Sequence, residues 1–362
     1  MDREYILVIN PGSTSTKVGL FRGEEEIKSH KITHSQKEIE RFDKIKEQYN
    51  YRLNLIYDWL KEENVTTSSL IAVVGRGGLF KSVPGGTYRV TDEMVKDLEI
   101  GIQGEHASNL GGILAKEIGD AEGIGAFIVD PIAVDEFDDI ARISGLKDIE
   151  RRSLTHALNI KAVSRRRAKE LNKELKDLNF IVAHLGGGIS VSPVLKGRII
   201  DGNNASEMGP FSPERTGGLP VGDLVSLCYS GKYTLDEMKI KLKGKGGLSS
   251  YLGTTNGKEI EDRVKNGDKN AELIYSAMAY QIGKEIGAMA TVLKGNVDNI
   301  ILTGGLAYSS YLVNIISEMV EFIAEVVVYP GEDEMDALNR GVLRVLSGEE
   351  KAKIYEHEVI NR

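Results

Sequence analysis

The chain has 362 residues, with 46 Lys or Arg against 54 Asp or Glu, so its formal net charge is −8. At about 150 residues per domain, this length predicts two domains that can each bury a core. An acidic chain lacks the basic excess that nucleic-acid backbones require, so we expect no nucleic acid as partner. The single cysteine, Cys228, excludes a disulfide within the chain and a multi-thiolate metal site. We expect the thiol to serve as packing in a cytoplasmic protein.

The N-terminal apolar run, Tyr5 to Ile9, is too short for a signal-peptide core, and no run reaches membrane-spanning length. We therefore expect no membrane partner. Glycine is more frequent than in most proteins: 40 of the 362 residues are glycine, which is about 11%, whereas the average is about 7%. The glycines cluster between apolar runs, a pattern typical of turns that approach phosphate groups closely.

Short apolar runs rich in β-branched residues alternate with longer amphipathic stretches along the chain, which predicts an α/β fold. The expected strands are Tyr5–Ile9, Val18–Phe21, Leu70–Val74, Gly125–Val129, Phe180–Ala183, Val297–Leu302 and Glu325–Tyr329. The expected helices are Ser35–Glu63, Asp92–Leu98, Gly111–Ile118, Asn159–Asp177, Ala271–Leu293 and Tyr308–Phe322.

Residues 6–23 and 180–197 resemble each other at a constant offset of 180 − 6 = 174 residues. Each copy reads as a buried strand, a small-residue turn, a second strand and a basic-Gly turn, which is Arg22-Gly23 in one copy and Lys196-Gly197 in the other. A chance match of two Gly-rich hairpins is the alternative interpretation. The equal spacing in the two halves nevertheless favours two related domains that face a shared cleft, where ligands commonly bind.

Three turns rich in Gly, Ser and Thr each follow an apolar strand directly. They are Asn10-Pro-Gly-Ser-Thr-Ser-Thr-Lys17, His184-Leu-Gly-Gly-Gly-Ile-Ser190 and Thr303-Gly-Gly-Leu-Ala307. Small residues let the backbone approach a phosphate, and hydroxyls, amides and the Lys17 ammonium bind its oxygens. Purely structural turns are the alternative, but three together favour a nucleotide triphosphate site. The chain lacks a Walker A motif and a dinucleotide-binding fingerprint, which argues against a P-loop protein and a nicotinamide-dependent dehydrogenase.

Four isolated polar residues stand in apolar or Gly-rich surroundings: Arg76, His106, Asp130 and His156. A charge at a strand end beside glycines is commonly a site residue, because ligands bind outside the carboxyl ends of strands in α/β sheets. Structural roles stay open for them. Asp130 is equally suited to cap a turn before Pro131, and the histidines to make structural hydrogen bonds.

Taken together, these motifs resemble the acetate and butyrate kinase family, the acetokinases, within the superfamily of sugar kinases, heat-shock ATPases and actin. The resemblance runs from Ile6 to Glu334 and is strongest to the butyrate kinase branch. That branch is indicated by Gly75-Arg-Gly-Gly78, Gly85-Gly-Thr-Tyr88, the His184 turn, and Asp201-Gly-Asn-Asn-Ala205 with Gly209-Pro-Phe-Ser-Pro-Glu-Arg215. It implies two duplicated actin-like (ribonuclease H-like) domains with a central cleft. Residues 1–150 with about 337–362 would form the first domain, and residues 151–336 the second, nucleotide-binding one.

The resemblance implies the reaction ATP + butanoate (or isobutanoate) = ADP + butanoyl phosphate, by direct in-line transfer with magnesium. It also implies a homo-oligomer, a dimer or larger. A sugar kinase and a nucleotide-gated, chaperone-like ATPase are the alternative functions within the superfamily. A carboxylate acceptor is already ionised at pH 7 and needs no strong base, whereas in a sugar kinase Asp130 would deprotonate a hydroxyl.

Residue by residue, the resemblance assigns catalytic roles to Arg76, Asp130, His156 and Arg215. It assigns substrate and phosphate binding to Asn10, Ser13, Ser15, Lys17 and His106, and magnesium to Asn10, Asp130 and Glu334, with Glu334 preferred over Glu332. It assigns nucleotide binding to His184, Gly186, Gly187, Gly188, Gly304, Gly305, Leu306 and Ala307. One departure is clear: Pro220 stands where acetate kinases carry a second catalytic arginine, and Arg215 is the candidate replacement.

Overall fold

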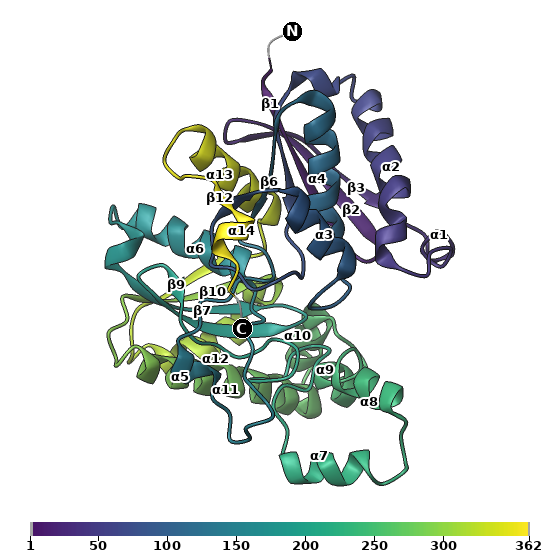
Figure 1. Cartoon of the computed structure of the whole chain (residues 1–362). Coiled ribbons are helices and arrows are strands. Elements are labelled where there is room, and N and C mark those ends of the chain that lie inside the picture. The colour runs from purple at the N-terminus through teal and green to yellow at the C-terminus, as the bar shows by residue number, and fades with distance from the viewer. Residues whose placement is uncertain (1–2, 361–362) are drawn as a thin grey trace. The chain divides into compact units, whose positions relative to one another are not determined.

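The computed structural model of the chain describes residues 3–360. Two compact units divide the chain (Figure 1): unit 1 comprises residues 1–135 and 333–362, and unit 2 comprises residues 136–332. No helix within residues 3–360 is both long enough and apolar enough to cross a lipid bilayer.

Unit 1 is built on a seven-stranded sheet with the strand order β12-β5-β6-β4-β1-β2-β3. Its strands are β1 (Tyr5–Pro11), β2 (Ser15–Arg22), β3 (Glu25–Thr33), β4 (Leu70–Arg76), β5 (Thr87–Arg89), β6 (Gly125–Val129) and β12 (Lys353–Ile354). Its helices are α1 (Gln36–Ile39), η1 (Ile45–Gln48), α2 (Tyr49–Glu62), η2 (Thr67–Ser69), α3 (Asp92–Ile100), α4 (Asn109–Glu122), α13 (Glu334–Leu346) and α14 (Tyr355–Glu358).

The centre of this sheet is parallel, since β4 runs parallel to both β1 and β6. Helices cover both faces of it. A side chain at Gly112 of α4 would meet Ile128, and one at Gly341 of α13 would meet Val129. Because neighbouring residues of a strand point to opposite faces, α4 and α13 lie on opposite sides of β6. Burial on both faces explains why β1 and β4 are nearly continuous apolar runs.

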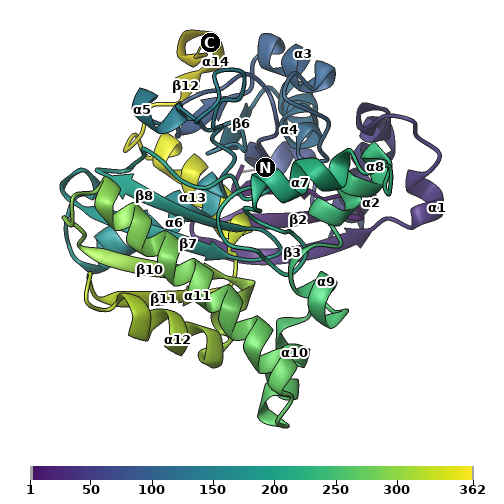
Figure 2. The ribbon, with the colours of Figure 1, turned by 90° about the horizontal axis from the view of Figure 1, so that it is seen from below.

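Unit 2 is built on a five-stranded sheet with the order β11-β10-β7-β8-β9. Its strands are β7 (Asn179–Leu185), β8 (Ile189–Leu195), β9 (Arg198–Ile199), β10 (Asn299–Gly304) and β11 (Val326–Pro330). Its helices are α5 (Asp139–Arg142), α6 (Ala157–Glu170), η3 (Leu175–Asp177), α7 (Val221–Cys228), α8 (Leu235–Leu242), α9 (Gly247–Leu252), α10 (Gly257–Lys265), α11 (Lys269–Val292), η4 (Gly305–Tyr308) and α12 (Ser310–Val320). Figure 2 shows the long helix α11 beside α12 along this sheet.

The two sheets repeat one topology. In unit 1 the order β6-β4-β1-β2-β3, and in unit 2 the order β11-β10-β7-β8-β9, place five successive strands in the same arrangement. The predicted α/β fold with a duplicated actin-like topology is therefore confirmed. The two copies differ in register: β1 and β2 pair Ile9 with Val18, whereas β7 and β8 pair Ala183 with Val191. When the two copies are aligned at the offset of 174, the β7–β8 hairpin has one residue fewer between its paired positions than the β1–β2 hairpin.

The predicted single helix Ser35–Glu63 is wrong, because this stretch forms α1, η1 and α2 in succession. Ser35 caps α1 together with Glu38, and α1 ends after one turn. The Glu47 carboxylate then accepts from the backbone N–H groups of Asp43 and Lys44 and starts the next helical segment. Two capping signals therefore divide a stretch whose apolar periodicity is continuous.

Two further expectations are wrong. The predicted helix Asn159–Asp177 ends at Glu170, since Asn172 adopts φ +52°, in the left-handed region that ends helices. Cys228 was expected as packing, but it lies exposed on α7, a helix without a buried residue.

The contact between β4 and α4 depends on two glycines that lie against each other. A Cβ atom at Gly75 would lie 1.9 Å from the Gly111 carbonyl oxygen, and one at Gly111 would lie 2.3 Å from the Arg76 carbonyl oxygen. No side chain fits between these backbones.

We predict that Gly75→Ala destabilises the protein by at least about 2 kcal/mol, because the added methyl must push helix and strand apart. Urea unfolding measures the change. Gly287→Ala on α11 is the control, since its Cβ would have no neighbour within 4 Å, and it should be neutral or slightly stabilising. Equal midpoints for the two variants would contradict the prediction.

Candidate active site

Three predicted site residues of unit 1 stand at neighbouring strand ends. Asn10 lies near the end of β1, Arg76 is the last residue of β4, and Asp130 follows β6. The register pairs Ile9 with Gly75 and Arg76 with Val129, so the three positions lie side by side at the carboxyl edge of the parallel strands. This is the edge where ligands bind in α/β sheets.

Glu334, the first residue of α13, joins two of these strands. The Asn10 side-chain amide donates a hydrogen bond of 2.6 Å to Glu334 Oε2. An Arg76 guanidinium nitrogen lies 3.0 Å from Glu334 Oε1, and the Arg76 side chain is only 11% exposed. The structure therefore gathers Asn10, Arg76 and Glu334 into one group of charged and polar side chains.

Asp130 is fully buried and adopts φ +36°. Its Oδ1 atom accepts a 2.7 Å hydrogen bond from the Gly86 N–H, and its own N–H donates to the Gly86 carbonyl at 2.9 Å. A positive φ is uncommon for residues other than glycine, and such conformations gather at functional sites. The carboxylate thereby holds the backbone just before β5.

The β1–β2 hairpin carries three of the predicted phosphate-binding residues, Ser13 in its turn and Ser15 and Lys17 on β2. Ser13 is exposed, Ser15 is half-buried, and Lys17 is exposed and lies opposite Asn10 in the register. His106 lies exposed in the loop before α4, with Nδ1 2.7 Å from Ser108 Oγ. The contacts that join Asn10, Arg76 and Glu334 do not include His106.

The oxygen atoms at this edge fit magnesium. Asn10, Asp130 and Glu334 offer only carboxylate and amide oxygens, the hard ligands that Mg²⁺ prefers. Within residues 3–360, no group of three or more His, Cys, Asp and Glu side chains could hold a metal ion by itself. Mg²⁺ usually takes one or two carboxylates together with water and substrate phosphates rather than a cage of protein ligands. The donor set therefore suits an ion that arrives with a nucleotide.

In unit 2, two histidines stack at the start of α6 and the end of β7. The His156 and His184 rings lie 3.8 Å apart at an angle of 13°. Nδ1 of His156 lies 2.9 Å from Ser190 Oγ. His184 is buried between Asn159 Oδ1, 2.9 Å from Nδ1, and Glu332 Oε1, 3.0 Å from Nε2. These two oxygen atoms fix the plane of the His184 ring, and the His156 ring stacks against it.

Sequence reasoning missed Asn159 and Ser190 as partners of these histidines. Asn159 follows His156 by three residues at the start of a helix, a spacing that places both on one face, and this signal could have been used. Ser190 belongs to the predicted glycine turn, but its position opposite His184 follows from the β7–β8 register.

The glycine turn at residues 186–188 makes room for Arg215. The Gly186 N–H donates to the Gly188 carbonyl at 3.2 Å, which closes the turn. A Cβ at Gly188 would lie 2.1 Å from an Arg215 guanidinium nitrogen, and the same nitrogen donates to the Ala205 carbonyl at 2.9 Å. Burial lowers the pKa of Arg215, and the neighbouring Glu214 carboxylate opposes this effect. The structure thus places a half-buried guanidinium against the predicted nucleotide turn.

The third predicted turn begins at the end of β10, next to β7. The register pairs Thr303 with His184. Gly304 has φ +90°, and a Cβ there would lie 2.5 Å from the Leu185 carbonyl oxygen, so only glycine fits. The chain continues as η4, where Gly305 is exposed, Leu306 is half-buried and Ala307 is buried. The two predicted nucleotide turns therefore lie side by side.

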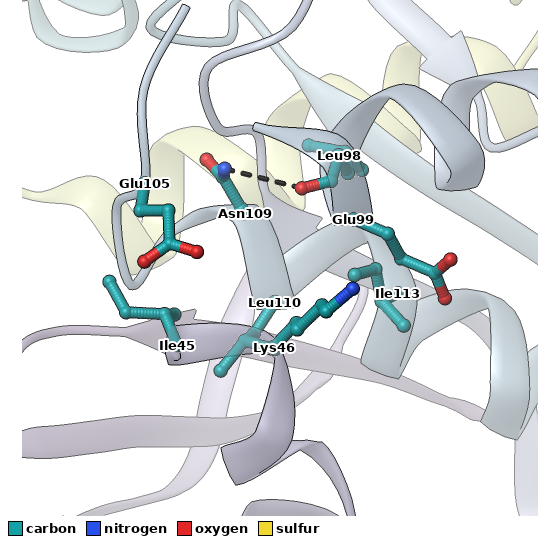
Figure 3. Close-up of a pocket in the computed structure, with 8 residues that line it drawn as sticks. All are labelled: Ile45, Lys46, Leu98, Glu99, Glu105, Asn109, Leu110 and Ile113. Carbon is teal, nitrogen blue, oxygen red and sulfur yellow. Dashed lines mark hydrogen bonds between the residues drawn. The ribbon is translucent and has the colours of Figure 1, made fainter. Parts of the chain in front are cut away.

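A small pocket in unit 1 lies outside the predicted site. Figure 3 shows it between η1, the end of α3 and the start of α4. Its lining residues are Ile45, Lys46, Leu98, Glu99, Glu105, Asn109, Leu110 and Ile113. None of them is a predicted site residue.

Comparisons with known proteins agree with the motifs. A family model described as the Acetokinase family matches residues 147–349. Butyrate kinase 1 of Clostridium acetobutylicum is 55% identical over 352 residues, which cover 97% of this chain and 99% of the relative. Probable butyrate kinase 2 of Caldanaerobacter subterraneus subsp. tengcongensis is 55% identical over 350 residues, with the same coverage. The chain belongs to the acetokinase family.

A solved structure shares the fold. The crystal structure of Porphyromonas gingivalis acetate kinase matches with a TM-score of 0.79 at 20% identity, covering 95% of this chain and 100% of that one. The fold of that acetate kinase is thus also the fold of this chain.

His34 is a buried histidine next to the β1–β2 turn, and it stays neutral. His34 Nε2 lies 2.9 Å from Thr16 Oγ1, and Nδ1 lies 3.2 Å from the Tyr51 hydroxyl. Burial, reinforced by the charge of Arg52 and opposed by Glu38, lowers the pKa of His34 to about 4.

We predict that His34 makes the protein less stable as the pH falls from about 6.5 to about 4. In this pH window His34 is protonated in the unfolded chain but stays neutral in the folded chain. The free energy of unfolding that His34 contributes above pH 6.5 is therefore lost on acidification. The loss attributable to His34 reaches at most about 3 kcal/mol. Urea unfolding at pH 7.5 and pH 5 should show a smaller loss for His34→Gln than for the unaltered protein. His30→Gln, at an exposed position of β3, should lose as much as the unaltered protein, and an equal loss for His34→Gln would refute the assignment.

Proposed function

We propose that the protein is a carboxylate kinase that transfers the γ-phosphoryl group of ATP to butanoate or isobutanoate and forms ADP and the acyl phosphate. The observation that carries this proposal is the identity of 55% over 97% of the chain with a protein named butyrate kinase. In the reaction a carboxylate oxygen forms the new bond to phosphorus, and the bond from phosphorus to the bridging oxygen of ADP breaks.

The chemistry of the acceptor explains the proposed residues of unit 1. A carboxylate is ionised at pH 7, so the enzyme needs no strong base. It must instead hold two anions in line and offset their repulsion. We assign Arg76 to the substrate carboxylate. Phosphate oxygens are assigned to Asn10, Ser13, Ser15, Lys17 and His106.

Asn10, Asp130 and Glu334 would hold Mg²⁺, which supplies positive charge to the phosphate oxygens when bound. The Gly86 N–H holds the Asp130 carboxylate in place. Asn10 and Arg76 hold the Glu334 carboxylate in place. Both acids are thereby pre-oriented before any ligand binds, which lowers the entropic cost of forming the site.

Residues of unit 2 are assigned to the nucleotide. We assign its phosphates to His184, Gly186, Gly187, Gly188, Gly304, Gly305, Leu306 and Ala307, where small residues let backbone N–H groups approach. His156 and Arg215 would donate to the phosphoryl oxygens as charge develops on them. Ser190 and the His184 ring orient His156 for this role.

We further propose that units 1 and 2 are the two domains of a cytoplasmic homo-oligomer. Large apolar side chains exposed on unit 2 support association, among them Val221 at 72%, Tyr229 at 89% and Phe322 at 82% exposure.

The first test is to trap acyl phosphate with hydroxylamine in the presence of ATP and Mg²⁺, across acetate, propionate, butyrate, isobutyrate and valerate. We expect the strongest colour with four-carbon acids and a graded decline on either side, because one methylene is worth only about 1–3 kcal/mol of discrimination. Glucose and glycerol serve as controls. ATP turnover with a sugar, and no colour with any acid, would overturn the proposal.

A second test concerns the Arg215 guanidinium. We predict that Gly188→Ala lowers kcat about as much as Arg215→Ala, roughly 100-fold, because the added methyl displaces that guanidinium. The double variant should lose little more than either single one, since both changes remove the same interaction. Gly222→Ala, with no neighbour within 4 Å of its Cβ, is the control and should keep full activity. Full activity of Gly188→Ala would contradict the assigned role of Arg215.

A further inference from the structure

We propose that Arg52 is a positioning residue that shapes the β1–β2 turn for phosphate binding from behind, without contacting the phosphate. The inference rests on the proposed function, in which this turn binds phosphate oxygens. Arg52 lies on α2, outside every motif that the sequence singled out.

The Arg52 guanidinium is buried, and no carboxylate within residues 3–360 pairs with it. The side chain is 1% exposed. Burial lowers the pKa of Arg52 to about 10. A buried charge is costly unless hydrogen bonds satisfy it, so its partners reveal what the residue is for.

Those partners lie mainly in the turn. One terminal nitrogen donates to the Gly12 carbonyl at 2.9 Å, the Ser15 carbonyl at 3.3 Å and Thr16 Oγ1 at 2.9 Å. The other donates to the Ser13 carbonyl at 3.5 Å. The side chain of Gln48 accepts the remaining bonds at 2.8 and 3.1 Å. One planar fork thus binds three carbonyl oxygens of the turn.

The direction of these carbonyls decides the direction of the peptide N–H groups. In a trans peptide, the N–H points away from the preceding C=O. Since the Gly12 and Ser13 carbonyls point toward Arg52, the N–H groups of Ser13 and Thr14 point away from it. The Thr14 carbonyl is likewise occupied, by the His34 N–H at 2.8 Å. An anion on the outer side of the turn would therefore meet donors and the exposed Ser13 and Thr14 hydroxyls rather than carbonyl oxygens.

The charge of Arg52 adds to this effect. A positive group behind the turn, screened little by water, favours an anion in front of it. Lysine could supply the charge, but its ammonium is compact and cannot reproduce a planar fork. The geometry therefore requires arginine in particular.

The test compares Arg52→Ala and Arg52→Lys with the unaltered full-length protein. We expect Arg52→Ala to lower kcat at least 30-fold while the KM for butyrate changes less than threefold, because an ordered phosphate turn acts most strongly in the transition state. Added guanidinium at millimolar concentration should restore part of the activity of Arg52→Ala, and urea should not. Arg52→Lys should remain at least 10-fold impaired.

Arg142→Lys is the matched control, because this arginine is also buried, with 5% exposure, and donates to the Phe137 carbonyl in unit 2. It should lose stability in urea as Arg52→Lys does but keep its kcat. A loss of activity in Arg52→Ala that only matches its unfolded fraction, without rescue by guanidinium, would show a merely structural role.

Binding of inorganic phosphate, followed by ³¹P line width, separates this inference from the proposed function. We expect at least fivefold weaker binding to Arg52→Ala, whichever acid the enzyme phosphorylates. Acyl phosphate formation by the unaltered protein reports on the function itself. Unchanged phosphate binding by a folded Arg52→Ala would overturn the role of Arg52, even if the protein is a butyrate kinase.

Discussion

The carboxylate of Glu334 is the interaction on which unit 1 depends. It accepts from Asn10, which is 324 residues away in the sequence, and pairs with Arg76, so it ties helix α13 to two strands of the sheet. Removing one partner of this half-buried pair leaves the other charge unsatisfied, which weakens the link between α13 and the sheet. The same contact orients an acid, an amide and a guanidinium at the edge of the sheet before a ligand arrives. Stability and pre-organisation of the candidate site thus share one group of atoms.

Much of the fold could be predicted because its determinants are local. Apolar β-branched runs indicated the central strands, and the repeat of residues 6–23 at 180–197 indicated the duplicated topology. The stretch Ser35–Glu63 failed because capping by Ser35 and Glu47 outweighed a continuous apolar periodicity. Strand β3 carries no buried residue, so it leaves no hydrophobic pattern, and pairing with β2 alone defines it.

In the candidate site, too, some residues could be predicted from the sequence and others could not. Glycine turns and charges at strand ends can be found in a sequence, and Asn10, Arg76 and Glu334 do come together. The roles of these residues in phosphoryl transfer stay predictions. The residues that orient them, such as Asn159 beside His184 and Arg52 beneath the β1–β2 turn, act through tertiary contacts. Arg52 sits on an amphipathic helix where an arginine normally faces solvent, and nothing in its neighbourhood reveals that the side chain is buried.

The division of unit 1 between the two ends of the chain has a consequence for synthesis on the ribosome. Unit 2 is one continuous segment, residues 136–332, whereas unit 1 requires residues 333–362 as well. At roughly 5–20 residues per second, about 10 to 40 s separate the emergence of the first part of unit 1 from that of α13. During this interval the sheet of unit 1 lacks one of its covering helices and Arg76 lacks Glu334. A nascent chain therefore completes unit 2 first and closes unit 1 last.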